Sequence, residues 1–458
     1  GDFVAEMKNQ KGLSKSLKRF FGVGDFGFGL MSNIDTFYAS YFFTNIAKFS
    51  LSAVTVMTTI SAVVDAVLSC LYGPLLNRIK PRKWGRYRSW LILTPWLVPF
   101  LYAMQFVKIS NGIAGAIFIT MAMITSRIAW NIPFVANISM INIVGKTQKE
   151  RMALSSTRMV WTSLATVVYS YVGPAAVAAF AGFLGETNAY AATAFSFAAL
   201  MAAGYYAHFR MTKGYEETGE EELKRIAEET ARTKQQKQKK VSALAAIGCN
   251  PHLIFLFASN ITKYIVLFLV NGLAIYYFEY VSKDKGLLTG FLFAANLLGI
   301  GASYCSRFIV AKFSAKRTVI LGYLVMGVSG ISAFLVYKNT MVVMVLMCIL
   351  LFSMNMTNSC DPELYAKCAA YSGSKLGYDV TGIVMGLLTV PIKVGIIMRG
   401  ILISACLSLA HFDVGVDPLA STEEMQRGIS IGFMILPALV ILAGAAILGF
   451  GYRLKQED

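Results

Sequence analysis

Seven ionisable side chains lie well inside long apolar runs of the sequence, where a charge is energetically unfavourable and points to a functional site. They are Asp35, Asp65, Arg127, Arg158, Lys263, Lys393 and Arg399. Asp65 has apolar or small neighbours for about two helical turns on either side, in the segment TTISAVVDAVLSCLYG. Such a carboxylate can bind a cation, carry a proton, or neutralise a basic residue of another run. We predict that Asp65, with Ser69, couples cation or proton movement; a structural ion pair is the alternative.

A second group of residues has the types expected of a binding site for an organic molecule. Its members are Phe28, Asp35, Arg127, Trp130, Asn131, Arg158, Trp161, Thr389 and Lys393. Arg127 and Asn131 are four residues apart and therefore share a helix face. The cationic side chains can hold an anionic part of a ligand, and the aromatic rings can stack on its apolar body. Packing alone also explains each aromatic residue taken singly, and Arg158 could instead snorkel toward the membrane surface.

The elements that must position these residues are apolar runs long enough to cross a bilayer, which takes roughly 20 residues. Twelve such runs lie near 22–46, 51–76, 89–107, 113–144, 153–182, 187–209, 251–281, 287–311, 318–337, 340–360, 378–411 and 427–452. Hydrophobic residues make up 56% of the 458 residues and charged residues only 15%. This composition excludes a water-soluble enzyme, a secreted disulfide scaffold and a disordered polypeptide.

The distribution of Lys and Arg predicts the orientation of the chain in the membrane. Thirty of them lie at the termini and in the even-to-odd connections between runs, against six in the odd-to-even connections. By the positive-inside rule this places both termini in the cytoplasm of a multi-pass protein of the plasma (inner) membrane. The net charge of +17 is then a topogenic signal that faces anionic lipid, and nucleic-acid binding is not expected. The basic, polar first twenty residues are not expected to be a signal peptide.

One charged segment divides the runs into two sets of six. We predict an N-terminal six-helix bundle at 1–209, a cytoplasmic linker with a surface helix at 210–250, and a C-terminal six-helix bundle at 251–458. Each half has a basic turn after its second run, at 77–88 and 306–317. Two six-helix halves joined by a long loop predict an all-α membrane protein of the secondary-transporter kind, with its site between the halves.

Several segments resemble, in order, motifs of the glycoside–pentoside–hexuronide:cation symporter family, to which the melibiose permease belongs, within the major facilitator superfamily. They are GVGDFGFGL, YFFTNIAKFS, VVDAVLSCLYGPLLNRIKPRKWGRYRSW, WNIPF, ERMALSSTRMVW and TVPIKVG. The resemblance runs along most of the chain at consistent spacing. It implies the major facilitator fold of twelve helices and cation-coupled transport of a sugar-like solute.

The resemblance also implies which ion is coupled. The melibiose permease holds its cation with two aspartates four residues apart, an Asn just before the second, and a hydroxyl on the fourth span. Asp65 keeps the first aspartate, whereas the other three positions read Leu68, Ser69 and Ile128. A sodium site needs several oxygen ligands, but one carboxylate is enough for a proton. Proton coupling through Asp65 is therefore favoured over sodium coupling, and uncoupled transport is the alternative.

The solute site departs from the family in a consistent direction. Positions that carry polar, acidic or aromatic residues in the family read Phe28, Gly29, Arg127, Asn131 and Val135 here. The family's fifth-span arginine and eleventh-span threonine and lysine are kept, as Arg158, Thr389 and Lys393. The resemblance thus implies a more apolar cavity with a bias toward an anionic group, as in a hexuronide, a sulfated or carboxylated solute, or an amphipathic organic anion.

These observations predict a secondary active transporter that moves a small organic solute with a cation by alternating access. No HExxH or GxSxG motif is present, so an enzyme is not expected. Two alternatives stay open: a transporter of an amphipathic, steroid-like or lipid-like solute without sodium coupling, and a transport-inactive scaffold. Beyond a proton or sodium we expect no cofactor, and the seven scattered cysteines predict no metal site. The expected partners of this predicted monomer are a small-molecule substrate and membrane lipid.

Overall fold

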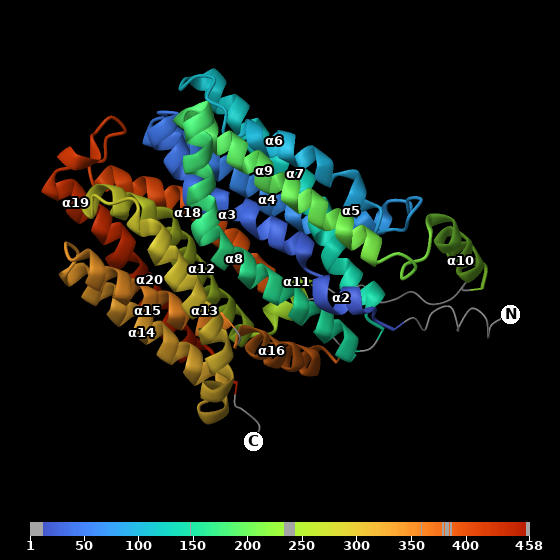
Figure 1. Ribbon diagram of the computed structural model, residues 1–458. Coiled ribbons are helices and arrows are strands. Elements are labelled where there is room, and N and C mark those ends of the chain that lie inside the picture. The colour runs from blue at the N-terminus through green and yellow to red at the C-terminus, as the bar shows by residue number, and fades with distance from the viewer. Residues whose placement is uncertain are drawn as a thin grey trace. The chain divides into compact units, whose positions relative to one another are not determined.

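Helices account for nearly all of the chain that can be described. The computed structural model describes residues 12–146, 148–232, 243–358, 360–377, 380, 384 and 387–454. Within these ranges there is no β-strand, and one isolated bridge joins Arg82 to Gly85 in a turn (Figure 1). The prediction of an all-α protein is therefore confirmed.

The first six predicted runs all coincide with helical segments. These are α3 (Val23–Tyr41) with η1 (Phe42–Ile46), α4 (Leu51–Arg78), α5 (Trp90–Leu93) with η2 (Pro95–Leu97) and α6 (Val98–Met104), α7 (Ile113–Val144), α8 (Gln148–Leu184) and α9 (Glu186–Met211), after the short α2 (Lys15–Phe20). Pro95 and Pro99 explain why the third run is broken into pieces, because proline removes a backbone donor and ends a helix at its N-terminal side. Gly24 and Gly204 let α3 and α9 approach closely: a Cβ on Gly204 would lie 2.7 Å from the Cα of Gly24.

The rest of the described chain is also helical. Its elements are α10 (Gly219–Arg232), α11 (Ala243–Gly248), α12 (Pro251–Tyr276) with η3 (Tyr277–Val281), α13 (Leu287–Lys312), α14 (Ala315–Leu335), α15 (Thr340–Asn358), α16 (Asp361–Leu376), η4 (Leu387–Thr389), α18 (Val390–Leu409), η5 (Pro418–Ala420), α19 (Glu423–Ser430), η6 (Ile431–Ile435) and α20 (Leu436–Gly451). Helix α10 lies within the segment 210–250, and most of its side chains are exposed. Figure 1 shows α12, α13, α14, α15 and α20 running alongside one another, and each packs against at least one other member of this group.

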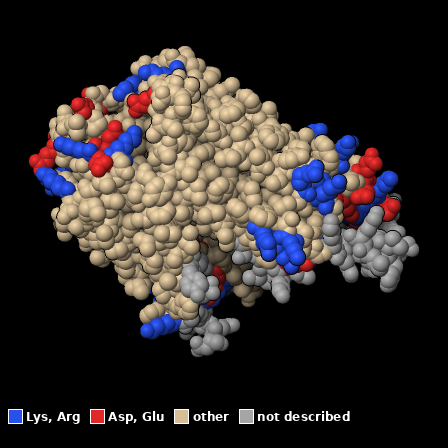
Figure 2. All heavy atoms as spheres, viewed as in Figure 1, with Lys and Arg blue, Asp and Glu red and all other residues tan. Residues whose placement is uncertain are grey.

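Eight helical segments of the described chain are long and apolar enough to cross a membrane, and two shorter apolar ones lie at Trp90–Met104 and Leu287–Ala302. On the face seen in Figure 2, charged side chains gather around α10 and α19 and leave the sides of the long helices uncharged. This is the distribution expected of helices whose sides face lipid and whose ends face water.

Contacts divide the chain into two compact units. One comprises Gly1–Asp35 and Val63–Gln238, and the other comprises Thr36–Ala62 and Lys239–Asp458. Helices α3 and α4 therefore each contribute one end to each unit, since the end of α3 and the start of α4 pack with the later part of the chain. The predicted division into bundles 1–209 and 251–458, joined by the linker 210–250, stays a prediction.

Two matching π-helical turns lie in the second unit. Element η1 follows Tyr41 and element η3 follows Tyr276, and each is closed by one i-to-i−5 hydrogen bond, Ala47 N to Phe42 O (2.8 Å) and Ser282 N to Tyr277 O (3.0 Å). Each turn is followed by a lysine in the left-handed backbone region. Lys48 has φ of 62° and Lys283 has φ of 58°, a conformation that is uncommon for non-glycine residues.

The side chains of these two turns contact each other reciprocally. Tyr41 donates to Glu279 Oε1 (3.1 Å), and the hydroxyls of Thr44 and Tyr276 share a hydrogen bond (2.8 Å). In the aligned segments YFFTNIAK and YYFEYVSK, Tyr41 corresponds to Tyr276 and Thr44 to Glu279. The contacts therefore repeat one pairing twice, as a pseudo-twofold axis would generate.

Candidate functional site

Asp65 lies on α4 and is held by a residue of α7. Asn131 donates from its Nδ2 to Asp65 Oδ1 (2.8 Å) and also to the backbone carbonyl of Arg127 (2.8 Å). Both side chains are buried, with relative exposures of 7% for Asp65 and 5% for Asn131. Ser69 donates its hydroxyl to the backbone carbonyl of Asp65 (2.7 Å), so its proton is used within α4. The predicted coupling residue is thus linked by one amide to the turn that carries Arg127.

Asp35 is the centre of a second buried cluster. Arg127 Nη2 lies 3.1 Å from Asp35 Oδ2, and Gln105, just after α6, donates from Nε2 to Asp35 Oδ1 (2.6 Å). Arg127 Nη1 and Gln105 Oε1 are also buried and have no hydrogen-bond partner among the described residues. This cluster therefore retains one donor and one acceptor that a polar ligand could use. The structure brings the predicted residues Asp35 and Arg127 together.

Arg158 belongs to a third cluster, at the start of α3. Its Nε lies 2.8 Å from Asp25 Oδ1, and Asn137 of α7 donates to Asp25 Oδ2 (3.1 Å). The guanidinium also lies over the ring of Phe134, 5.7 Å from its centroid. The sequence placed Asp25 near the edge of its run and so gave no reason to pair it with Arg158, which lies 133 residues away.

A buried histidine completes this third cluster. His208 Nε2 accepts from the backbone N–H groups of Gly22 and Gly24 (both 3.0 Å), and its Nδ1 lies 2.7 Å from Asn137 Oδ1. Because Nε2 accepts twice, we assign the proton to Nδ1, which then donates to Asn137. His208 holds the start of α3 in place, a role that a lone histidine near the end of a run did not reveal.

The predicted aromatic residues divide into two places. Phe28 stacks on Phe134 with centroids 4.7 Å apart, and it meets Trp130 edge-on at 6.4 Å. Trp130 and Phe134 lie on α7, the helix that also contains Arg127 of the Asp35 cluster and Asn131 of the Asp65 cluster. Trp161 instead donates its indole N–H to the carbonyl of Arg19 in α2 (2.8 Å) and packs edge-on against Phe26. Thr389 and Lys393 belong to the second compact unit, where Thr389 is exposed and Lys393 is half-buried.

The ion pairs change the charge balance expected from the sequence. The resemblance implied a bias toward an anionic group, whereas each of the two arginines Arg127 and Arg158 has a carboxylate of its own. Arg127 pairs with Asp35 and not with Asp65, and Arg158 pairs with Asp25. These two arginines therefore give no surplus positive charge. Among the described residues no three His, Cys, Asp or Glu side chains form a metal-binding group.

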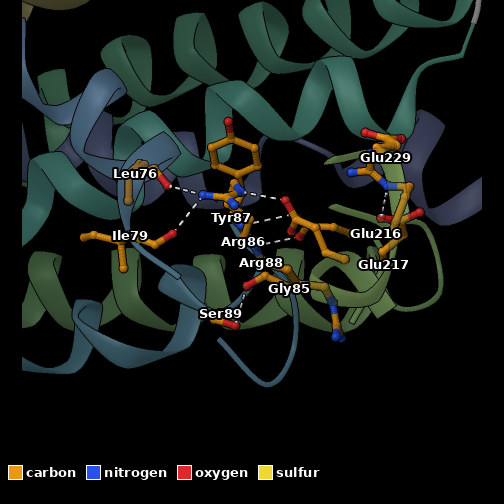
Figure 3. A network of polar contacts seen from close by, with 12 residues as sticks. Leu76, Ile79, Gly85, Arg86, Tyr87, Arg88, Ser89, Glu216, Glu217 and Glu229 are labelled. Atoms are coloured by element: carbon orange, nitrogen blue, oxygen red, sulfur yellow. Dashed lines mark hydrogen bonds and ion pairs between the residues drawn. The ribbon is translucent and has the colours of Figure 1, made fainter. Parts of the chain in front are cut away.

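A polar clamp that the sequence did not reveal joins the basic turn after α4 to the segment after α9 (Figure 3). Glu216 accepts from the backbone N–H groups of Tyr87 (3.0 Å) and Arg88 (2.9 Å). Arg86 pairs with Glu222 (2.8 Å) and also donates to the carbonyls of Leu76 and Ile79, shown as dashed lines in Figure 3.

Burial shifts the titration of two groups in this clamp. It raises the pKa of the Glu216 carboxyl above its usual range and lowers the pKa of the Arg88 guanidinium. A cavity of about 330 Å³ lies beside the clamp, lined by residues that include Tyr87, Lys146 and Glu216. The glutamates of this segment were interpreted from sequence only as charges of a solvated linker.

Comparisons with known proteins agree with this architecture. The family model described as MFS/sugar transport protein matches residues 20–456. An "Uncharacterized symporter" of Bacillus subtilis is 21% identical, with coverage of 99% of this chain and 96% of that protein. The "Putative glycoside/cation symporter" of Escherichia coli is 23% identical (95% and 91% covered), and the "Putative sulfoquinovose importer" of Salmonella typhimurium is 23% identical (97% and 91% covered).

Solved structures share the fold at low sequence identity. The nucleoside transporter NupG superimposes with a TM-score of 0.63 at 10% identity, and the match covers 95% of this chain and 99% of that one. A D-xylose-proton symporter gives a TM-score of 0.63 at 12% identity, with 94% and 97% covered. The predicted major facilitator fold is confirmed.

Proposed function

Because the chain belongs to the MFS/sugar transport protein family, we propose that it is a cation-coupled symporter that moves a small organic solute across a membrane by alternating access. The observation that carries this proposal is the position of Asn131. One amide group donates both to Asp65, the candidate coupling carboxylate, and to the backbone of Arg127, a candidate ligand-binding residue. We expect a change of charge at Asp65 to act through this amide on the turn that carries Arg127.

We propose the proton as the coupling ion. Asp65 is one buried carboxylate with an amide donor beside it, and sodium sites require several oxygen ligands. A proton needs only the carboxylate, which is neutral when protonated and then suits a low-dielectric surrounding. Sodium coupling would require further oxygen atoms to join Asp65 and Ser69.

We propose a glycoside or hexuronide as the solute. A relative named as a glycoside/cation symporter supports this class. The buried donor of Arg127 and the acceptor of Gln105 supply hydrogen-bonding capacity for hydroxyl groups, and the Phe28–Phe134 pair supplies a flat apolar wall. That same wall favours a second candidate, an amphipathic steroid-like or lipid-like solute moved without sodium.

The test uses purified protein in proteoliposomes with an imposed pH gradient and a panel of labelled glycosides, glucuronides and steroid conjugates, with and without sodium. We expect the wild type to accumulate a panel member when the gradient is present, independently of sodium. Asp65→Asn mimics the protonated carboxyl, so it should abolish accumulation while counterflow exchange of the same solute continues. Accumulation by Asp65→Asn at the wild-type level would contradict the coupling role, and absence of all uptake would favour the scaffold alternative.

We also propose that the protein resides in the plasma (inner) membrane as a monomer, with both termini and the 210–250 segment in the cytoplasm. The excess of Lys and Arg in the connections on that side supports this orientation.

A further inference from the structure

A second buried ion pair lies in the second compact unit. Lys263 of α12 pairs through its Nζ with Asp361 Oδ2 of α16. The relative exposures are 1% for Lys263 and 4% for Asp361, which makes this the most deeply buried ion pair found in the described chain. The clusters of Asp25, Asp35 and Asp65 belong to the other unit.

Asp361 lies near the middle of the apolar segment Thr340–Leu376, which is long enough to cross a membrane. Helix α15 ends at Asn358 and α16 begins at Asp361, with Pro362 directly after it. The carboxylate therefore lies in the first turn of a 16-residue helix, where backbone N–H groups favour negative charge.

One carboxylate oxygen of Asp361 has no hydrogen-bond partner among the described residues. Oδ2 is engaged by Lys263, whereas Oδ1 is buried and accepts no hydrogen bond from any described residue. A carboxylate that served only to neutralise Lys263 would be expected to have both oxygens satisfied, because an unsatisfied buried acceptor is unfavourable. Protonation of Oδ1 removes that unsatisfied acceptor but leaves the buried Lys263 ammonium without a counter-charge, so we expect it only as the pH falls.

The side chains around the pair are polar but uncharged at physiological pH. Among the described residues, the titratable groups that interact with it are Tyr264 of α12, Tyr323 of α14, Tyr365 of α16 and Cys360. Glu363, on the same helix as Asp361, pairs instead with Lys367 (3.6 Å). Asn260 donates to the Tyr365 hydroxyl (3.1 Å) and so fixes α16 against α12 beside the pair. The tyrosines and the cysteine are neutral at physiological pH, so the state of Asp361 decides the charge of the cluster.

We propose that Lys263 and Asp361 form a second proton-carrying site, in the half of the molecule that does not contain Asp65. One proton from water adds to Asp361 Oδ1, turning the carboxylate into a carboxyl while Lys263 remains an ammonium group, so the charge of the pair rises from zero to plus one. Release of that proton restores the pair. Protonation weakens the attraction between α12 and α16 and so couples proton uptake to their separation. This inference rests on the proposed transport function for its use, but proton binding itself does not.

The first experiment detects the proton without any solute. Infrared difference spectra of the full chain in lipid are recorded from acid to alkaline pH for the wild type, Asp361→Asn and Asp361→Glu. We expect a carboxyl C=O band in the wild type that appears as the pH falls, is missing in Asp361→Asn, and returns at a shifted frequency in Asp361→Glu. The exposed pair Lys338 and Glu423 supplies the control, because Glu423→Gln should leave that band unchanged. Identical spectra for the wild type and Asp361→Asn would overturn the proposal.

The second experiment separates a proton site from a purely structural pair. In the double variant Lys263→Met/Asp361→Leu, apolar groups of similar size replace both charges, which buried pairs often tolerate. Proton-to-solute stoichiometry is measured with a pH-sensitive dye and methyl glucuronide, or another panel member that the wild type transports. We expect the double variant to fold with near-wild-type thermal stability and to lose one proton per transport cycle. A folded double variant with wild-type stoichiometry would mean that the pair is structural. If the wild type transports no panel member, the proposed function fails while the infrared result still decides the proton site.

Discussion

At the scale of single residues, Arg158 and Lys393, both cations of the predicted ligand site, lie in different compact units. Arg158 is committed to Asp25 within a buried network that continues to Asn137. Lys393 lies half-buried at the start of α18 in the other unit. A cation committed to a buried carboxylate has little capacity left to distinguish an anionic solute from a neutral one.

We therefore expect Arg158→Ala to act on stability. For Lys393, which matches the lysine of the family that the sequence resembles, we expect Lys393→Ala to act on solute selectivity. Removing Arg158 leaves the Asp25 carboxylate buried without its cation, which should lower stability by about 3–5 kcal/mol. Lys393→Ala should weaken transport of a glucuronide more than that of the matching neutral glucoside. Thermal unfolding and paired uptake assays measure the two effects. Equal losses of glucuronide and glucoside uptake in Lys393→Ala would show that this lysine does not recognise charge.

The residue scale also shows where sequence reasoning stops. Arg127 and Asn131 were predicted to share a helix face, and they do, because spacing within one helix fixes that relation. The partner of Arg127 could not be predicted: Asp35 and Asp65 were both within the predicted spans, and only packing between helices selects Asp35. Asp25 and His208 were overlooked because residues near the ends of apolar runs are usually explained by the water interface.

At the scale of elements, the π-helical turns η1 and η3 are joined by two side-chain hydrogen bonds in the second unit, a contact that we call the latch. Thr44 and Tyr276 share one hydrogen bond, and Tyr41 and Glu279 share another. We expect alternating access to break both contacts when this end of the protein opens. Each neutral hydrogen bond contributes about 1 kcal/mol, so losing one should shift the balance between closed and open roughly fivefold.

Thr44→Val tests the latch, because valine keeps the shape of threonine and removes the hydroxyl. A cysteine replacing the buried Ala39 should then react with a membrane-impermeant thiol reagent several times faster than in the parent protein. Thr55→Val is the matched control, since Thr55 bonds to the carbonyl of Leu51 in its own helix. Equal labelling rates in the Thr44→Val and control backgrounds would rule out a gating role for this contact.

The clamp between the basic turn and the segment after α9 predicts a pH dependence of stability. Burial raises the pKa of Glu216 in the folded protein, so the folded state holds the proton more tightly than the unfolded state. The contribution of Glu216 to stability is then fully present below its ordinary pKa and is lost as the pH rises through the raised value.

Glu216→Gln removes this titration and keeps one oxygen, which can accept from the N–H group of Tyr87 or of Arg88 but not from both, because each now bonds to a different carboxylate oxygen. We expect its thermal stability to rise relative to that of the wild type as the pH passes above the raised pKa. Glu217→Gln, which alters an exposed ion pair with Arg225, is the control and should follow the wild type. A difference between Glu216→Gln and the wild type that is constant across pH would contradict the assignment.

At the scale of the whole molecule, the sequence predicted the helices well and their grouping only in outline. All twelve apolar runs contain helices, since long apolar periodic segments specify helices strongly. The run at 378–411 begins in a stretch that is only partly described, and its described helix starts at η4. That the end of α3 and the start of α4 pack with the second half could not be predicted, because hydropathy does not report which helices are neighbours.

The predicted orientation gives the whole-molecule test. We expect a reporter inserted in 233–242, and another fused after the last residue, to be cytoplasmic. The reason is that the termini and the connections on that side contain thirty Lys and Arg, whereas the connections on the other side contain six. A cytoplasm-dependent fluorescent reporter and a periplasm-dependent phosphatase distinguish the two sides. Phosphatase activity at either position would reverse the orientation.

The division of α3 and α4 between the two units has a mechanical consequence. The chain passes from one unit to the other within α3, between Asp35 and Thr36, and within α4, between Ala62 and Val63, which is less than one turn from Asp65. Asp35 and Asp65 therefore lie where α3 and α4 pass from one set of packing partners to another. We expect a change of charge at either carboxylate to act on a helix that contributes to both units.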